Sequence, residues 1–193
     1  MSIINSIDEK VRQTTVIHKN SFFTKADQYL KWAPFAAVAL LEVFKIRTKD
    51  DLKQRLLIVT LSEGILNSIV YPLKQLTNER RPDLSGKKKS FPSGHTATCF
   101  AGAELMREEL KENYPALALA GYGMAFTTGT LRILNKRHWL SDVIAGAVIG
   151  IISTRLTFLL YKKIKGYSEK KKKNNFKNVA VGQVINTTYQ EPA

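Results

Sequence analysis

Apolar residues gather along this chain into five segments, which are separated by short polar and charged stretches. The segments cover residues 29–46, 56–73, 95–105, 115–131 and 143–161. None is a long uninterrupted apolar run, but their number, their spacing and their basic flanks together predict helices that span a membrane. We therefore expect an all-α integral membrane protein whose core is a bundle of five spanning segments.

Two of these segments carry features that are typical of helices in lipid. Residues 115–131 contain no charged side chain and form the cleanest candidate span. In residues 143–161, Gly146 and Gly150 stand in a GxxxG spacing, which commonly marks close packing against another helix. The pattern thus predicts at least one tight helix–helix contact.

The two ends of the chain differ from this apolar middle. In the polar residues 1–28, Ile4, Ile7 and Val11 keep helical spacing, which predicts an amphipathic helix on the membrane surface. His18 is isolated there, and we interpret it as a surface histidine. This stretch lacks the apolar core of a signal peptide, so we expect that any export of the site depends on the membrane-spanning helices. We expect residues 29–161 to form the functional domain and residues 162–193 to be a basic, mobile tail.

Charge narrows the possible functions. The 193 residues include 30 basic and 16 acidic side chains, a net charge of +14. That excess fits a nucleic-acid binder, a membrane-surface protein or an enzyme for anionic substrates. The basic residues flank the apolar segments and no nucleic-acid module is recognisable, so we expect no nucleic-acid partner. The single Cys99 excludes an internal disulfide and a cysteine metal cluster.

The stretch Ser-Phe-Pro-Ser-Gly-His-Thr, residues 90–96, is the first candidate for chemistry. Proline and glycine break regular structure, and a run of small and apolar residues follows. Ser93, Gly94 and His95 would then stand at a helix N-terminus, where free backbone N–H groups favour an anion. His95 adds a group that titrates near neutral pH. The simpler alternative is that this turn is only a helix cap.

Two flanking stretches supply fixed positive charge. Lys74 and Arg81 precede the turn, and Arg132 follows it. The arginines have the fork geometry that suits phosphate. If the helix of residues 56–73 continued to Arg81, Lys74 and Arg81 would lie nearly on one face. Alternatively, all three are cations that reach the membrane interface.

His138 and Asp142 form the remaining pair. They are four residues apart, so on one helical turn the carboxylate would hold one ring nitrogen of the imidazole and direct the other outward. A helix cap is the alternative for this pair as well.

Together these motifs resemble the signature of the type 2 phosphatidic acid phosphatases (PAP2), a superfamily that includes bacterial acid phosphatases and vanadium haloperoxidases. The signature is Lys-x6-Arg-Pro, then Pro-Ser-Gly-His, then Ser-Arg-x5-His-x3-Asp. The match runs from Lys74 to Asp142, and the one departure is Leu131 in place of the serine before the arginine. This departure puts one hydroxyl contact to the phosphate in doubt.

The resemblance implies a role for each matched residue. His138 would be the nucleophile that forms a phosphohistidine, Asp142 would orient it, and His95 would protonate the leaving group and then activate water. The phosphate ligands would be Lys74, Arg81, Ser93, Gly94 and Arg132. No metal ion or other cofactor is implied, because three cationic side chains already supply the positive charge. Members of this type have six transmembrane helices, one more than the hydropathy pattern predicts here.

Alternate threading of the segments predicts the orientation. If residues 45–55 lie inside, residues 107–111 and 162–173 also lie inside, and all three motifs emerge together on the opposite face. Basic residues usually prefer the cytoplasmic side of a membrane, but several further ones remain on that opposite face, as the mouth of a site for an anionic substrate requires. They are Arg80, Lys87, Lys88, Lys89, Lys136 and Arg137.

These observations predict a multi-pass inner-membrane phosphatase that removes phosphate from a lipid at its periplasmic face. A head group with several negative charges fits the basic loop, and lipid A is the first candidate. Undecaprenyl pyrophosphate and phosphatidylglycerol phosphate are the alternatives. Two other possibilities stay open: a soluble phosphatase or haloperoxidase of the same superfamily, and a catalytically silent membrane protein that binds a phosphorylated lipid.

Overall fold

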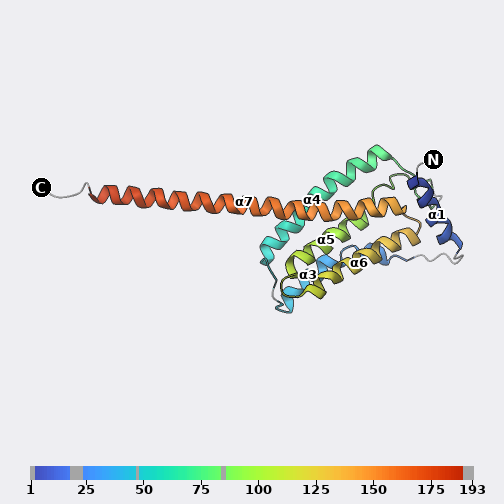
Figure 1. Ribbon diagram of the computed structural model, residues 1–193, viewed down its shortest axis with the longest axis horizontal. Helices are drawn as coiled ribbons and strands as arrows, with labels where there is room; N and C mark the ends of the chain where they lie inside the picture. The colour runs from blue at the N-terminus through green and yellow to red at the C-terminus, as the bar shows by residue number, and fades with distance from the viewer. Residues whose placement is uncertain (1–2, 18–23, 47, 84–85, 189–193) are drawn as a thin grey trace. The chain divides into compact units, whose positions relative to one another are not determined.

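The computed structural model describes residues 3–17, 24–46, 48–83 and 86–188, and within these ranges every regular element is a helix. His18 lies outside the described residues. The helices are α1 (Ile3–Ile17), α2 (Ala26–Leu30), α3 (Ala33–Val43), α4 (Leu52–Thr77), α5 (Gly94–Leu110), α6 (Pro115–Leu134) and α7 (Leu140–Thr188) (Figure 1). The all-α class expected from the hydropathy pattern is confirmed.

The chain divides into two units, residues 1–157 and residues 158–193. The first unit holds all the motif residues. Helix α7 begins in the first unit and continues to Thr188 in the second. The expected tail is therefore helical over most of its length, and its mobility stays a prediction.

Helix α4 ends before the second residue of its motif. Asp51 caps its start by accepting a hydrogen bond from the Gln54 N–H at 2.9 Å. At the other end, Asn78 adopts the left-handed conformation with φ of 46°, which terminates a helix. The helix consequently stops at Thr77, so Arg81 lies in the following loop and does not share a helix face with Lys74.

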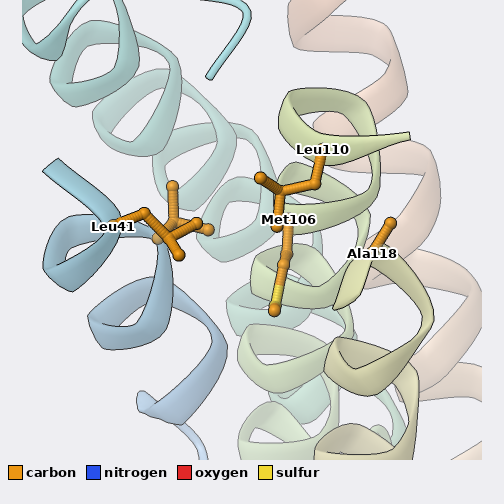
Figure 2. Packing of buried hydrophobic residues seen from close by; sticks show 5 residues of the cluster. Leu41, Met106, Leu110 and Ala118 are labelled. Carbon is orange, nitrogen blue, oxygen red and sulfur yellow. The ribbon is translucent and has the colours of Figure 1, made fainter. Parts of the chain in front are cut away.

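Helix α5 is the centre of the bundle. Ser93 is its N-cap, so the helix begins at Gly94, within one residue of the start predicted from the sequence. Its small residues Ala97, Ala101 and Ala103 are fully buried, and the helix contacts α3, α4 and α6. Figure 2 shows one of these contacts, where Met106 and Leu110 of α5 meet Leu41 of α3 and Ala118 of α6.

Helix α7 approaches α5 closely through its two spaced glycines. A Cβ on Gly146 would lie 2.5 Å from the carbonyl oxygen of Ser93. A Cβ on Gly150 would collide with the carbonyl oxygen of Ala97 and would lie 2.9 Å from the nitrogen of Ala101. The close packing predicted from the GxxxG spacing is therefore present, and it brings the start of α7 against the start of α5.

This contact gives a first testable prediction. Gly150→Ala is expected to destabilise the protein by about 1–3 kcal/mol, because its Cβ meets backbone atoms that cannot rotate away. Gly123→Ala is the matched control, since a Cβ there meets nothing within 4 Å and alanine favours a helix. Thermal unfolding of both variants in the same detergent measures the difference. Equal melting temperatures for the two variants would refute the packing described here.

The polarity of the bundle is that of a membrane protein. Its interior holds fully buried polar side chains such as Ser62, Glu104 and Thr128, whereas large apolar side chains such as Leu119 and Phe126 are 64% and 72% exposed. Water would penalise this arrangement and lipid favours it. In the described residues, Leu52–Thr77 and Leu140–Tyr167 are long and apolar enough to cross a membrane by themselves. The expected count of five spans stays a prediction.

Candidate active site

The structure brings His138 and Asp142 together in the interior. The two residues are 3% and 0% exposed, and Nδ1 of His138 lies 3.3 Å from Oδ2 of Asp142. The prediction that they share a helical turn is wrong, because α7 begins at Leu140 and His138 precedes it. Asp142 instead accepts the backbone N–H of Trp139 at 2.9 Å, which ties the loop that carries His138 to the first turn of α7.

Ser90 is a third member of this group, and the motif analysis assigned it no role. Its hydroxyl donates to Oδ2 of Asp142 at 2.5 Å and lies 3.5 Å from Nδ1 of His138. The carboxylate thus receives a hydroxyl, a backbone N–H and the imidazole on one oxygen. With Nδ1 held by the carboxylate, Nε2 is the ring nitrogen that is free to react.

The surroundings of His138 also determine its charge. Burial lowers the pKa of His138 below its ordinary value, and the hydrogen bond to Asp142 offsets this only in part. The positive charges of Arg132 and Lys74 act in the same direction as burial. The imidazole is therefore neutral at pH 7, which is the form that can attack phosphorus.

A cationic cavity of about 230 Å³ opens in the first unit, residues 1–157. It is lined by Thr24, Asp27, Gln28, Arg81, His95, Arg132, Asn135 and Arg137. Among the described residues, the Nε atoms of Arg81 and Arg132 are buried and have no hydrogen-bond partner. Both atoms have almost no accessible surface, so the positive character of the cavity comes from the three arginines that line it, and anion binding there stays a prediction.

The N-terminus of α5 is a helix cap in this structure, and its role in binding an anion stays a prediction. The Ser93 hydroxyl accepts the backbone N–H of Thr96 at 3.4 Å, so this serine is a helix cap, and its own N–H donates to the carbonyl of Asp142 at 3.0 Å. Gly94 and His95 occupy the first turn, where N–H groups have no partner within the helix. Ser93 therefore positions the first turn of α5 against α7. The N–H groups of Gly94 and His95 directly follow this serine.

Lys74 holds the loop that precedes α5. Its ammonium group donates to the carbonyl oxygens of Lys89, Ser90 and Pro92 at 3.1, 3.1 and 2.6 Å. These three bonds use all the donors of the ammonium group. In this structure Lys74 thus positions Ser90 and adds positive charge, and its predicted direct contact to a phosphate stays a prediction.

The further basic residues predicted on the motif face do not form one cluster. Lys87, Lys88 and Lys89 are exposed on the loop between α4 and α5. Arg137 lines the cationic cavity and lies 3.9 Å from Asp83. Lys136 lines a different, narrow pocket beneath α1, together with His138 and Trp139. Only Arg137 therefore shares the cavity with Arg81 and Arg132.

Sequence reasoning missed Asp27 and Asn135, which also line the cavity. Asp27 forms a buried ion pair with Arg132, and Asn135 donates to the same carboxylate at 3.3 Å. A buried arginine signals that a carboxylate must be near. No local pattern could indicate which one, because Asp27 precedes Arg132 by 105 residues.

With this geometry established, comparison with known proteins identifies the class. The fold and site define a helical membrane protein whose first unit holds a cationic cavity and a buried histidine–aspartate pair. Residues 55–165 match the family described as the PAP2 superfamily. The match covers more than half of the chain, so the chain belongs to the PAP2 superfamily.

Individual relatives agree with this placement. The chain is 33% identical over 174 residues to a lipid A 1-phosphatase of Porphyromonas gingivalis, covering 86% of this chain and 38% of the relative. It is 34% identical over 79 residues to a non-specific acid phosphatase of Providencia stuartii, covering 40% of this chain and 30% of that protein. The chain thus spans well under half the length of these two relatives.

Two solved structures share the fold. The crystal structure of Aquifex aeolicus LpxE superposes with a TM-score of 0.59 at 19% identity, covering 82% of this chain and 96% of that one. A transmembrane PAP2-type phosphatidylglycerolphosphate phosphatase from Bacillus subtilis superposes with a TM-score of 0.59 at 18% identity, covering 88% of each chain. The fold of this chain is therefore that of membrane PAP2 proteins.

Proposed function

We propose that this protein is a membrane phosphatase that removes a phosphate from an anionic lipid through a phosphohistidine at His138. One observation carries the proposal. A buried, neutral imidazole, bonded to Asp142, lies in the same unit as a cavity lined by Arg81, His95 and Arg132. The backbone N–H of His138 donates to the Arg132 carbonyl at 3.3 Å, which holds the main chain of the histidine beside that of the arginine.

The proposed first step is transfer of the phosphoryl group to His138. Arg81, Arg132 and the N-terminus of α5 bind the phosphate oxygens and neutralise their charge. Nε2 of His138 attacks phosphorus in line with the leaving oxygen, while the bond from phosphorus to that oxygen breaks. The negative charge of the bound phosphate favours uptake of a proton from water by His95, which gives this proton to the leaving alkoxide, so the lipid departs as a neutral alcohol.

The second step releases inorganic phosphate. His95, now neutral, removes a proton from a water molecule, and the resulting hydroxide attacks phosphorus. The bond between phosphorus and Nε2 then breaks, which returns His138 to its starting form. Asp142 keeps the imidazole in one orientation through both steps and stabilises the positive charge that the ring acquires in the phosphorylated state.

Lipid A is the substrate that we propose first. The exposed Lys87, Lys88 and Lys89 suit a head group with more than one phosphate, and a relative at 33% identity is a lipid A 1-phosphatase. Phosphatidylglycerol phosphate is the second candidate, because the Bacillus subtilis structure is a phosphatase for that lipid. Undecaprenyl pyrophosphate is the third. We further propose an inner-membrane location with the motif face toward the periplasm, on the charge distribution between the segments.

A substrate panel tests the proposal. Purified protein in detergent micelles is incubated with lipid A, phosphatidylglycerol phosphate, phosphatidic acid and undecaprenyl pyrophosphate, and released phosphate is measured. The highest kcat/KM is expected for lipid A. Faster release from another member of the panel would transfer the assignment to that lipid. No release from any member would favour the catalytically silent binding protein, and full extraction into buffer without detergent would favour the soluble alternative.

A further inference from the structure

Helix α2 contributes one buried carboxylate to the cationic cavity. The helix is only five residues long, and its Asp27 is 2% exposed. Oδ2 of Asp27 accepts from Nη1 of Arg132, and Oδ1 accepts from the side-chain amide of Asn135 at 3.3 Å. Both oxygens of this carboxylate are therefore used by residues at the end of α6.

The segment that carries Asp27 is attached to the same place by a second pair of hydrogen bonds. The backbone N–H of Thr24 donates to Oδ1 of Asn135 at 3.1 Å, and the amide of Asn135 donates to the Thr24 carbonyl at 2.9 Å. Asn135 is 8% exposed and directly follows α6. It thus fixes Thr24 and Asp27 to the end of the helix that carries Arg132.

This attachment leaves one side of the Arg132 guanidinium unused. Nη1 is bonded to Asp27, whereas the buried Nε has no partner among the described residues. A guanidinium that is held on one side can offer its remaining N–H groups to a phosphate in a fixed orientation. Without Asp27, the flexible arginine side chain would lose entropy each time it bound a phosphate.

We propose that Asp27 is a positioning residue that holds Arg132 in the orientation that binds the substrate phosphate. This inference rests on the proposed role of Arg132 as a phosphate ligand. Asp27 lines the cavity, but its two oxygens are used by Arg132 and Asn135, so it acts on the substrate through the guanidinium. The opposite arrangement, in which Asp27 competes with the phosphate for Arg132, predicts the opposite kinetic effect.

A double-mutant cycle tests the proposal. Asp27→Asn, Arg132→Lys and the double variant are purified, and kcat and KM are measured in micelles on the best substrate of the panel. Asp27→Asn is expected to lower kcat/KM about 10- to 100-fold, the range that is typical for a residue that orients a ligand group. Lysine lacks the fork that Asp27 holds, so adding Asp27→Asn to Arg132→Lys is expected to cost no further activity.

The outcomes separate this inference from the proposed function. Losses that multiply in the double variant, or a rise in activity with Asp27→Asn alone, would overturn the positioning role. Full activity of Arg132→Lys and of Arg132→Ala would instead refute the phosphate site itself. If Asp27→Asn does not fold, Asn135→Ala serves in its place. It is expected to lower kcat/KM by a smaller factor, and to cost no further activity when it is added to Arg132→Lys.

Glu109→Gln is the matched control for the loss of a buried ion pair. Glu109 is 2% exposed on α5, and its Oε2 lies 3.5 Å from Nε of Arg55, outside the cavity. It is expected to lower the melting temperature as Asp27→Asn does, but to keep kcat/KM below the unfolding transition. An equal loss of kcat/KM in both variants would reduce Asp27 to a structural role.

Discussion

His138→Ala is expected to abolish phosphate release, with a fall in kcat on the order of 10⁴-fold or more, as for the loss of a catalytic nucleophile. Alanine has no side-chain nitrogen that can attack phosphorus, and among the described residues no other histidine forms a hydrogen bond with Asp142. The fold should persist, because Asp142 keeps its bonds to Ser90 and to the Trp139 N–H. Phosphate release and thermal unfolding, measured on the same preparation, check both parts of this prediction.

A phosphoenzyme assay makes this prediction more specific. Brief exposure to labelled substrate should leave acid-labile label on the native protein and none on His138→Ala. His95→Ala should retain label for longer when the leaving group needs no protonation, because the water that attacks the phosphohistidine is no longer activated. Full activity of purified His138→Ala would refute the assignment of the nucleophile.

Asp142→Asn is expected to leave weak activity, with kcat reduced about 10³- to 10⁴-fold. The carboxylate accepts from Ser90, Trp139 and the imidazole on one oxygen. An amide nitrogen in that place would donate to Nδ1, so the proton would move to Nε2 and block the attacking atom. That nitrogen cannot accept from the Ser90 hydroxyl or the Trp139 N–H, so a lower melting temperature is expected beside the loss in kcat. Steady-state kinetics with a parallel melting curve measures this.

Ser90→Ala is the comparison for Asp142→Asn. It removes one donor from the carboxylate but leaves the imidazole–carboxylate pair, so the expected loss is about tenfold, within the range for an orienting partner. A kcat for Asp142→Asn at the native level would show that the tautomer of His138 is controlled by another group. A larger loss for Ser90→Ala than for Asp142→Asn would give Ser90 a direct role in the reaction.

Several features of the fold could be predicted because their causes lie within a few residues. A serine followed by glycine and then small residues predicts a helix start, and α5 begins there with Ser93 as its cap. Gly146 and Gly150 predict a close helix contact, and both meet the backbone of α5. The expected helix shared by His138 and Asp142 failed because α7 begins only at Leu140. Asp142 stands in the first turn of α7 and accepts the Trp139 N–H, whereas His138 lies in the loop before the helix.

The sequence by itself determined which residue types stand at the motif positions: their short, fixed spacings indicate two histidines, three cations and the start of a helix. Only the tertiary structure decided which groups stabilise them. Lys74 bonds carbonyls of the loop before α5, Ser90 holds Asp142, and Asp27 pairs with Arg132. The physical reason is that a buried charge must find its partner through space, and helix packing brings together residues whose separation in the sequence carries no signal.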